Sequence, residues 1–195
     1  NINTDAIVIN QTDCETLEEL NFEGYKVKIF SNSELGVAKS RNMALKNAAG
    51  DICILADDDM QFTDGYKETV IDIYERHNAD IIIFNFANDD DKLNRKNQTV
   101  KNVNIFNYMN YGAARITFKN DAIKNKNISF KETYNGIPLP ACGEDTLFLR
   151  EALKKGLKII AVPESLAKLT NNRESTWFKG YTKEYFFTTN LFFKL

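Results

Sequence analysis

The sequence has 195 residues, of which 43% are hydrophobic, enough for one substantial core but too few for two domains of ordinary size. Its 25 Lys and Arg residues stand against 27 Asp and Glu residues, so the net charge of -2 gives no basic surface for nucleic acid. No apolar run approaches the ~18 residues that a membrane-spanning helix needs. Composition therefore predicts one domain and excludes nucleic acid as a partner.

The number and spacing of the cysteines indicate the redox environment of the protein. Cys14, Cys53 and Cys142 are odd in number, lie far apart and form no C-x-x-C pair. This spacing argues against a zinc site and is typical of proteins from a reducing environment. We therefore expect a cytoplasmic protein.

Hydrophobic periodicity gives an alternation of strands and helices. The predicted strands are residues 6–9, 26–30, 52–56, 81–87, 113–119 and 158–162, and the predicted helices are residues 36–49, 63–76, 121–126 and 147–155. Thr63 or Asp64 is expected to cap the second helix, and Pro163 to follow the last strand. Residues 134–143 contain two prolines and are interpreted as an ordered loop. This alternation predicts an α/β protein.

Three aspartates follow the strand at residues 52–56. Its apolar run predicts a buried strand of a parallel sheet, and ligands of open α/β sheets bind at the carboxyl ends of the strands. If the backbone stays extended, Asp57 and Asp59 point one way and Asp58 the other. Two converging carboxylates suit Mg²⁺ or Mn²⁺, which keep positions for water and phosphate oxygens. The alternative is an acidic surface turn.

A second acidic triplet, residues 89–91, follows the strand at residues 81–87. It runs directly into a polar stretch with its own counter-charges, at Lys92, Arg95 and Lys96. A solvated loop is therefore the favoured interpretation.

Arg41 lies on the apolar row of the predicted helix at residues 36–49. Burying an unpaired guanidinium is costly, so this side chain needs a carboxylate or a phosphate beside it. Arg41 is therefore either a phosphate or nucleotide contact or half of a structural ion pair.

Asp145 lies where the apolar row of the helix at residues 147–155 extends backwards to the helix start. Asp is a favoured N-cap residue, which is one explanation. A helix amino terminus also favours negative charge, and a carboxylate at a cleft can accept a proton. The two roles are compatible.

The segment at residues 175–195 carries aromatic residues at helical spacing, with lysines among them. Such a helix either packs on the core or lies at a lipid surface. Trp177, the only tryptophan, is either a packing anchor or a platform for a sugar ring.

In this order, these features resemble the family 2 glycosyltransferases of GT-A fold. Three stretches carry the resemblance: GVAKSRNMALKNAAGDICILADDDM, GEDTLFLREALKKGLKI and ESTWFKGYTKEYFF. The resemblance implies an α/β fold with a mixed, mostly parallel central sheet flanked by helices, as a single domain over residues 1–195. It also implies that the family's first strand and helix are absent, which leaves the edge of the strand at residues 6–9 unpaired.

The resemblance also implies roles for individual residues. Within the DXD motif, Asp57 would contact the donor's ribose and help to hold the metal that Asp59 binds. Arg41 would help to hold the nucleotide. Asp145 would be the general base, and Glu144 would orient the acceptor or support the base.

Other positions depart from the family pattern. Asn10 and Gln11, with Asp13 beyond them, stand where the family has an acidic residue that reads the nucleotide base, so Asn10 and Asp13 are the expected nucleotide contacts. Asn171 and Asn172 stand where some relatives place a histidine near the metal. Trp177 is the expected acceptor contact.

The implied activity is that of an inverting, hexosyltransferase-like enzyme of polysaccharide or glycoconjugate synthesis. It would use a nucleotide-diphosphate sugar, Mn²⁺ or Mg²⁺, and a glycan or lipid-linked acceptor, with peripheral contact at the inner face of the membrane through the carboxyl-terminal helix. One alternative is a non-catalytic or truncated relative that binds nucleotide sugar or glycan. Another is a sugar-1-phosphate nucleotidyltransferase, which normally opens on a glycine-rich, basic segment that this sequence does not show.

Overall fold

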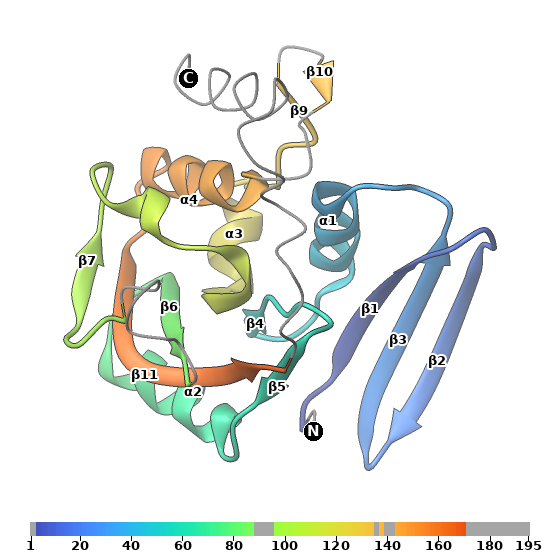
Figure 1. The fold of residues 1–195 in the computed structure, drawn as a ribbon, viewed down its shortest axis with the longest axis horizontal. Helices are drawn as coiled ribbons and strands as arrows, with labels where there is room; N and C mark the ends of the chain where they lie inside the picture. Colours follow the sequence, from blue (N-terminus) through green and yellow to red (C-terminus); the bar gives the residue numbers. More distant parts are fainter. Residues whose placement is uncertain (1–2, 88–95, 135–136, 139–142, 171–195) are drawn as a thin grey trace.

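The computed structural model describes residues 3–87, 96–134, 137–138 and 143–170. In this part of the chain, strands form a three-stranded sheet, a six-stranded sheet and a two-stranded ribbon (Figure 1). The helices are α1 Val37–Asn47, α2 Tyr66–Arg76, α3 Asn120–Asn125 and α4 Glu144–Lys154, with 3₁₀ turns η1 Tyr108–Asn110 and η2 Ala113–Arg115. The strands are β1 Ala6–Gln11, β2 Thr16–Phe22, β3 Tyr25–Asn32, β4 Ile52–Ile54, β5 Met60–Phe62, β6 Ile81–Phe86, β7 Lys101–Val103, β8 Ile116–Lys119, β9 Thr133–Tyr134, β10 Ile137–Pro138 and β11 Ile159–Leu169.

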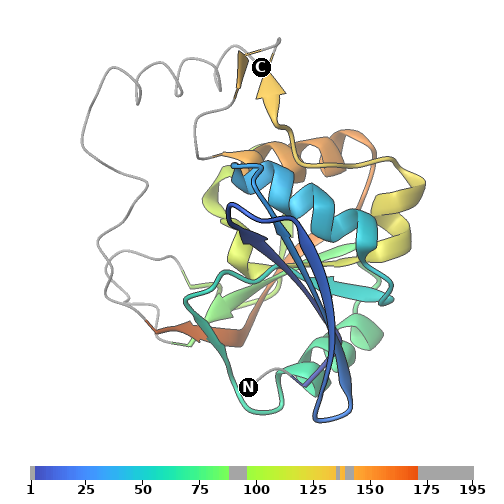
Figure 2. The same cartoon turned by 90° about the vertical axis from the view of Figure 1, so that its right-hand side faces the viewer.

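The three-stranded sheet has the order β1-β3-β2 and lies beside α1 (Figure 2). β1 runs parallel to β3, whereas β2 and β3 form an antiparallel hairpin. The hairpin turns at Glu23 and Gly24, both with positive φ, as a tight turn between twisted strands requires. Every residue of β2 is exposed, so its sequence has no buried apolar alternation and the strand was not predicted.

The six-stranded sheet has the order β4-β8-β6-β11-β5, and β7 pairs antiparallel with the first part of β11. Its central strand, β6, is buried along its whole length. Successive side chains alternate between the faces. Ile81 and Ile83 therefore pack with α3 and α4, and Ile82 and Phe84 pack with α2. The predictions of the helices α1, α2, α3 and α4 and of the strand β6 are confirmed, with small shifts at their ends.

β4 differs from its prediction as a buried strand of a parallel sheet. It is shorter, only partly buried, lies at the sheet edge and pairs antiparallel with β8. Its apolar sequence has another cause, because Ile52 and Ile54 pack against the α2 side of the sheet while Cys53 and Leu55 pack against the α4 side. The mixed, helix-flanked sheet is confirmed, but β6 and β11 form the parallel pair among its described strands and the other pairs are antiparallel.

β11 is longer than predicted and continues through Pro163. Its register against β6 shifts on either side of Ser165, and proline is tolerated in a strand at such an irregularity. Its first part runs parallel to β6 and its last part antiparallel to β5. This course brings Thr170 to the turn that carries the aspartates.

The start of α2 also differs from expectation. Gly65, in the left-handed region with φ of 72°, is the N-cap residue in place of Thr63 or Asp64. The Thr63 hydroxyl donates instead to the carbonyl of Leu166, which ties the helix start to β11. No helix in the described ranges has the length and apolar character needed to cross a membrane.

Candidate active site

The aspartates at residues 57–59 form the turn between β4 and β5. The Met60 N–H donates to the Asp57 carbonyl at 3.3 Å, so the backbone turns here and the expected alternation of extended side chains is wrong. Asp57 and Asp58 are exposed, and Asp59 is partly buried. The Asp59 carbonyl accepts from the Thr170 N–H at 2.8 Å and from its hydroxyl at 2.9 Å. The turn is thus fixed to the end of β11.

Arg41 connects this turn to α4. Its Nη2 lies 3.2 Å from Asp57 Oδ1, and its Nη1 donates to Glu144 Oε1. Only 12% of the side chain is exposed, and its guanidinium lies 5.7 Å from the ring centroid of Phe130. The predicted need for an acidic partner is therefore met twice. Arg41 brings the aspartate turn and the start of α4 into one charged cluster.

Glu144, the first residue of α4, is the buried acid of this cluster, with 7% of its side chain exposed. Burial raises the pKa of Glu144, the neighbouring Asp145 raises it further, and Arg41 opposes both effects. A carboxylate that is enclosed and paired with Arg41 is poorly placed to contact an acceptor in solvent. The geometry favours the other implied role, support of the base.

Asp145 is not the N-cap residue of α4, because Gly143 holds that position with φ of 95°. The capping explanation is therefore wrong. The partly buried Asp145 carboxylate accepts from the Ala113 N–H at 3.0 Å through Oδ2 and from the Thr146 N–H at 2.6 Å through Oδ1. These bonds fix its orientation and tie α4 to the turn η2.

The expected nucleotide contacts lie at the carboxyl end of β1. Asn10 is exposed, with its Nδ2 3.4 Å from Ser31 Oγ, and Asp13 is exposed beyond the strand. Between them, Gln11 donates to Ser40 Oγ at 2.9 Å and so joins this strand end to α1, the helix of Arg41. Several positions singled out in the sequence lie outside the described residues: Cys142, Asn171, Asn172, Trp177, the triplet at residues 89–91 and the predicted helix at residues 175–195.

The donor set at the aspartate turn fits a hard divalent cation bound together with a phosphate. Asp57, which is exposed, and Asp59, which is partly buried, offer two carboxylates within one turn. No group of three or more His, Cys, Asp or Glu residues that could hold a metal occurs among the residues that the structure describes. Mg²⁺ and Mn²⁺ need few ligands from the protein, because they bind one or two carboxylates together with waters and substrate phosphates.

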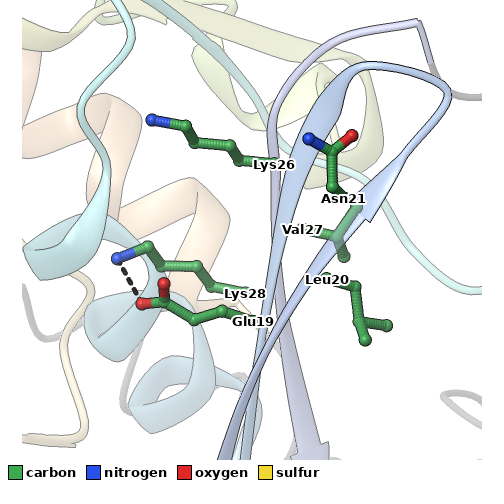
Figure 3. A pocket seen from close by; sticks show the side chains of 6 residues that line it. All are labelled: Glu19, Leu20, Asn21, Lys26, Val27 and Lys28. Carbon is green, nitrogen blue, oxygen red and sulfur yellow. Dashed lines mark ion pairs between the residues drawn. The ribbon is translucent and has the colours of Figure 1, made fainter.

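Two pockets in the described residues lie away from the cluster of Arg41, Asp57 and Glu144. One, of about 220 Å³, is on the β2–β3 hairpin (Figure 3). It is lined by Glu19, Leu20, Asn21, Lys26, Val27 and Lys28, with an ion pair of 2.8 Å between Lys28 and Glu19. Another, of about 400 Å³, lies where β2, β3 and α1 meet. Neither includes Arg41, Asp57 or Glu144, so chemistry rather than cavity size identifies the candidate site.

Residues 7–157 match the family model described as Glycosyl transferase family 2. The chain belongs to this family. A comparison with curated proteins gave no match. Among solved structures, Staphylococcus aureus TarS 1-349 in complex with UDP-GlcNAc is 18% identical with a TM-score of 0.66, covering 87% of this chain and 50% of that one. The TarS 1-349 complex with UDP is 19% identical with a TM-score of 0.59, covering 76% and 44%.

A further crystal structure of TarS 1-349 is 16% identical with a TM-score of 0.63, covering 85% of this chain and 51% of TarS 1-349. The present chain thus spans about half the length of TarS 1-349. The likeness confirms the GT-A fold that the sequence resemblance implied.

Two residues that shape the candidate site were not predicted from the sequence. Phe130 lies under Arg41, and Thr170 holds the aspartate turn. Phe130 is an ordinary core residue by its pattern, and Thr170 follows a strand that was expected to end before it. A polar residue just beyond a longer β11 was the available signal for Thr170.

Replacing Glu144 by Gln is expected to change how stability depends on pH. Because the pKa of Glu144 is raised from its usual 4.5, the folded state holds this proton more tightly than the unfolded chain. The stabilisation from Glu144 is then complete below its unfolded pKa and is lost as pH rises through the higher folded pKa. Urea unfolding of both proteins at several pH values should show the original chain losing stability relative to Glu144→Gln as pH rises from 4.5.

Glu68, exposed in the first turn of α2, provides the control. Glu68→Gln gives the effect of a Glu-to-Gln change outside the Arg41 cluster, and the Glu144→Gln results are compared with it. A constant stability difference between Glu144→Gln and the original chain across this pH range would contradict the expectation.

Proposed function

We propose that this chain is a metal-dependent, inverting glycosyltransferase that transfers a sugar from a UDP-linked donor to a hydroxyl acceptor. The contact of Arg41 with both Asp57 and Glu144 carries the proposal, because it unites the aspartate turn with the acidic start of α4. Membership of family 2 supports the reaction class. The complexes of TarS with UDP-GlcNAc and with UDP support the choice of uridine nucleotide.

On the donor side, Asp59 and Asp57 would hold Mn²⁺ or Mg²⁺ beside the diphosphate. The bound ion supplies neutralisation of the charge that grows on the departing nucleotide. Arg41 adds a second positive charge, and guanidinium groups recognise phosphate oxygens well. Asn10 and Asp13, at the strand end beside α1, would contact the nucleoside.

On the acceptor side, Asp145 would take the proton of the attacking hydroxyl. Its two backbone hydrogen bonds hold the carboxylate in one orientation, as a base needs. The new bond forms at the sugar's anomeric carbon while the bond to the diphosphate breaks, and the nucleotide leaves with the bonding electron pair. One base without a second carboxylate nucleophile corresponds to a single displacement, which inverts the anomeric centre.

The acceptor class extends the proposal. A growing glycan or a lipid-linked sugar would supply the hydroxyl that this reaction needs, so the proposed role of the enzyme is in polysaccharide or glycoconjugate synthesis. We assign it to the cytoplasm, with peripheral contact at the membrane through residues 175–195. Trp177 is the proposed platform for the acceptor sugar.

Thermal unfolding in the presence of nucleotides tests the donor. UDP with Mn²⁺ should raise the melting temperature, since a ligand at 100 times its Kd stabilises the native state by about 2.7 kcal/mol. GDP and CDP are the matched controls, and chelator should reduce the effect of UDP. Release of UDP from UDP-GlcNAc then separates turnover from binding. A melting temperature that no nucleoside diphosphate raises, with or without metal, would contradict the proposed function.

A further inference from the structure

Asn42, the neighbour of Arg41 on α1, holds a backbone segment from a distant part of the chain. Its Nδ2 donates to the Phe130 carbonyl at 2.9 Å, and the Phe130 N–H donates to its Oδ1 at 2.8 Å. The same Nδ2 also donates to Glu132 Oε1 at 2.9 Å. One amide side chain thus satisfies both backbone groups of Phe130, as a neighbouring strand would. It fixes this residue relative to α1.

The aromatic ring of Phe130 contacts α4, the helix that begins with Glu144. Phe130 is 1% exposed, and its ring stacks on Phe148 of α4, with 4.4 Å between centroids and 7° between planes. The guanidinium of Arg41 lies 5.7 Å from the centre of the same ring. Phe130 therefore contacts Arg41 and the core of α4 at once.

These contacts close a ring of interactions. From α1, Asn42 holds the Phe130 backbone, and the Phe130 ring packs on α4. Glu144 of α4 in turn forms an ion pair with Arg41 of α1. Protein interiors are packed so tightly that one of these side chains cannot move without displacing the others. The position of Arg41 relative to Asp57 and Glu144 then depends on the Asn42 amide, although that amide touches neither carboxylate.

We propose that Asn42 is a positioning residue that acts through Phe130 to hold Arg41 in place for the donor diphosphate. This inference rests on the proposed function for the identity of the ligand. Preorganising a charged side chain strengthens binding because less freedom is lost when the ligand arrives.

The test is a double-mutant cycle with UDP and Mn²⁺ as the probe, measured by calorimetry. Asn42→Ala should weaken UDP binding about fivefold in the original chain and have little further effect in Arg41→Ala, because its effect passes through Arg41. Asn47→Ala is the matched control, since Asn47 lies on the same helix and its Nδ2 donates within that helix, to the carbonyl of Met43. It should leave UDP affinity unchanged in both backgrounds.

A purely structural role for Asn42 predicts the same fold-change in both backgrounds, and that result, or an unchanged affinity in Asn42→Ala, would overturn the proposal. If Asn42→Ala does not unfold cooperatively, Asn42→Asp replaces it, since it keeps the acceptor for the Phe130 N–H and removes both donated bonds. The same non-additivity is expected.

A cycle that needs no ligand separates this inference from the proposed function. In urea unfolding, the Asn42 and Arg41 variants should be coupled by about fivefold in the unfolding equilibrium constant. Additive effects would overturn the positioning role. Coupling in this cycle, together with no UDP binding by the original chain, would support the positioning of Arg41 and contradict the nucleotide assignment alone.

Discussion

The Asp145→Asn variant is expected to release UDP from UDP-GlcNAc at least ~10²-fold more slowly than the original chain, with UDP affinity changed by less than about twofold. The substitution keeps the size of the side chain but removes the carboxylate that would accept the acceptor's proton. It also places an amide NH₂ against one of the two backbone N–H groups that now bond Asp145, so the melting temperature should fall. Turnover, UDP titration and thermal unfolding on the same samples separate these effects.

Asp121 offers a matched control, because it is an exposed acid in the first turn of another helix, α3. Asp121→Asn should leave turnover and UDP affinity as they are. Near-normal turnover in Asp145→Asn, despite a lower melting temperature, would show that Asp145 only joins α4 to η2 through Ala113.

The core of the fold was predictable because its elements carry periodic apolar residues. In α2, Tyr66, Val70, Ile73 and Tyr74 recur at helical spacing and are all buried. The strand β6 is apolar along almost its whole length and is the buried centre of the sheet. The edges were not predictable in the same way. β2 is exposed throughout, and β4 has the composition of a central strand because both of its faces pack against apolar clusters.

The sequence indicated which residues of the candidate site carry charge, but not which of them contact one another. The position of Arg41 on an apolar row required a carboxylate or a phosphate as partner, yet nothing local identified Glu144, which lies 103 residues further along the chain. The alternation expected for Asp57 and Asp59 failed because the backbone turns at Met60. The capping role expected for Asp145 failed because Gly143 adopts a left-handed conformation at the N-cap. Each failure comes from backbone geometry that the apolar pattern does not encode.

The strong dependence of UDP binding on metal should disappear in Asp59→Asn. In the original chain, Mn²⁺ should tighten UDP binding at least tenfold over chelator, about 1.4 kcal/mol, because an ion held by these carboxylates would neutralise charge on the diphosphate. Asp59 is a cleaner target than Asp57, whose carboxylate also pairs with Arg41. The turn should survive the substitution, since Thr170 bonds the backbone carbonyl of Asp59 and not its side chain. Calorimetry with Mn²⁺ and with chelator gives both affinities.

Asp58 is the control, because it is an exposed acid in the same turn as Asp59. If the metal effect comes from the general negative charge of the turn, Asp58→Asn and Asp59→Asn should reduce it equally. If Asp59 is a ligand, Asp58→Asn should keep most of the effect and Asp59→Asn should lose it, because direct coordination needs a carboxylate at one defined position. Equal UDP affinity with Mn²⁺ and with chelator in the original chain would contradict the metal role. Arg41 would then be the cation left at this site to face the diphosphate.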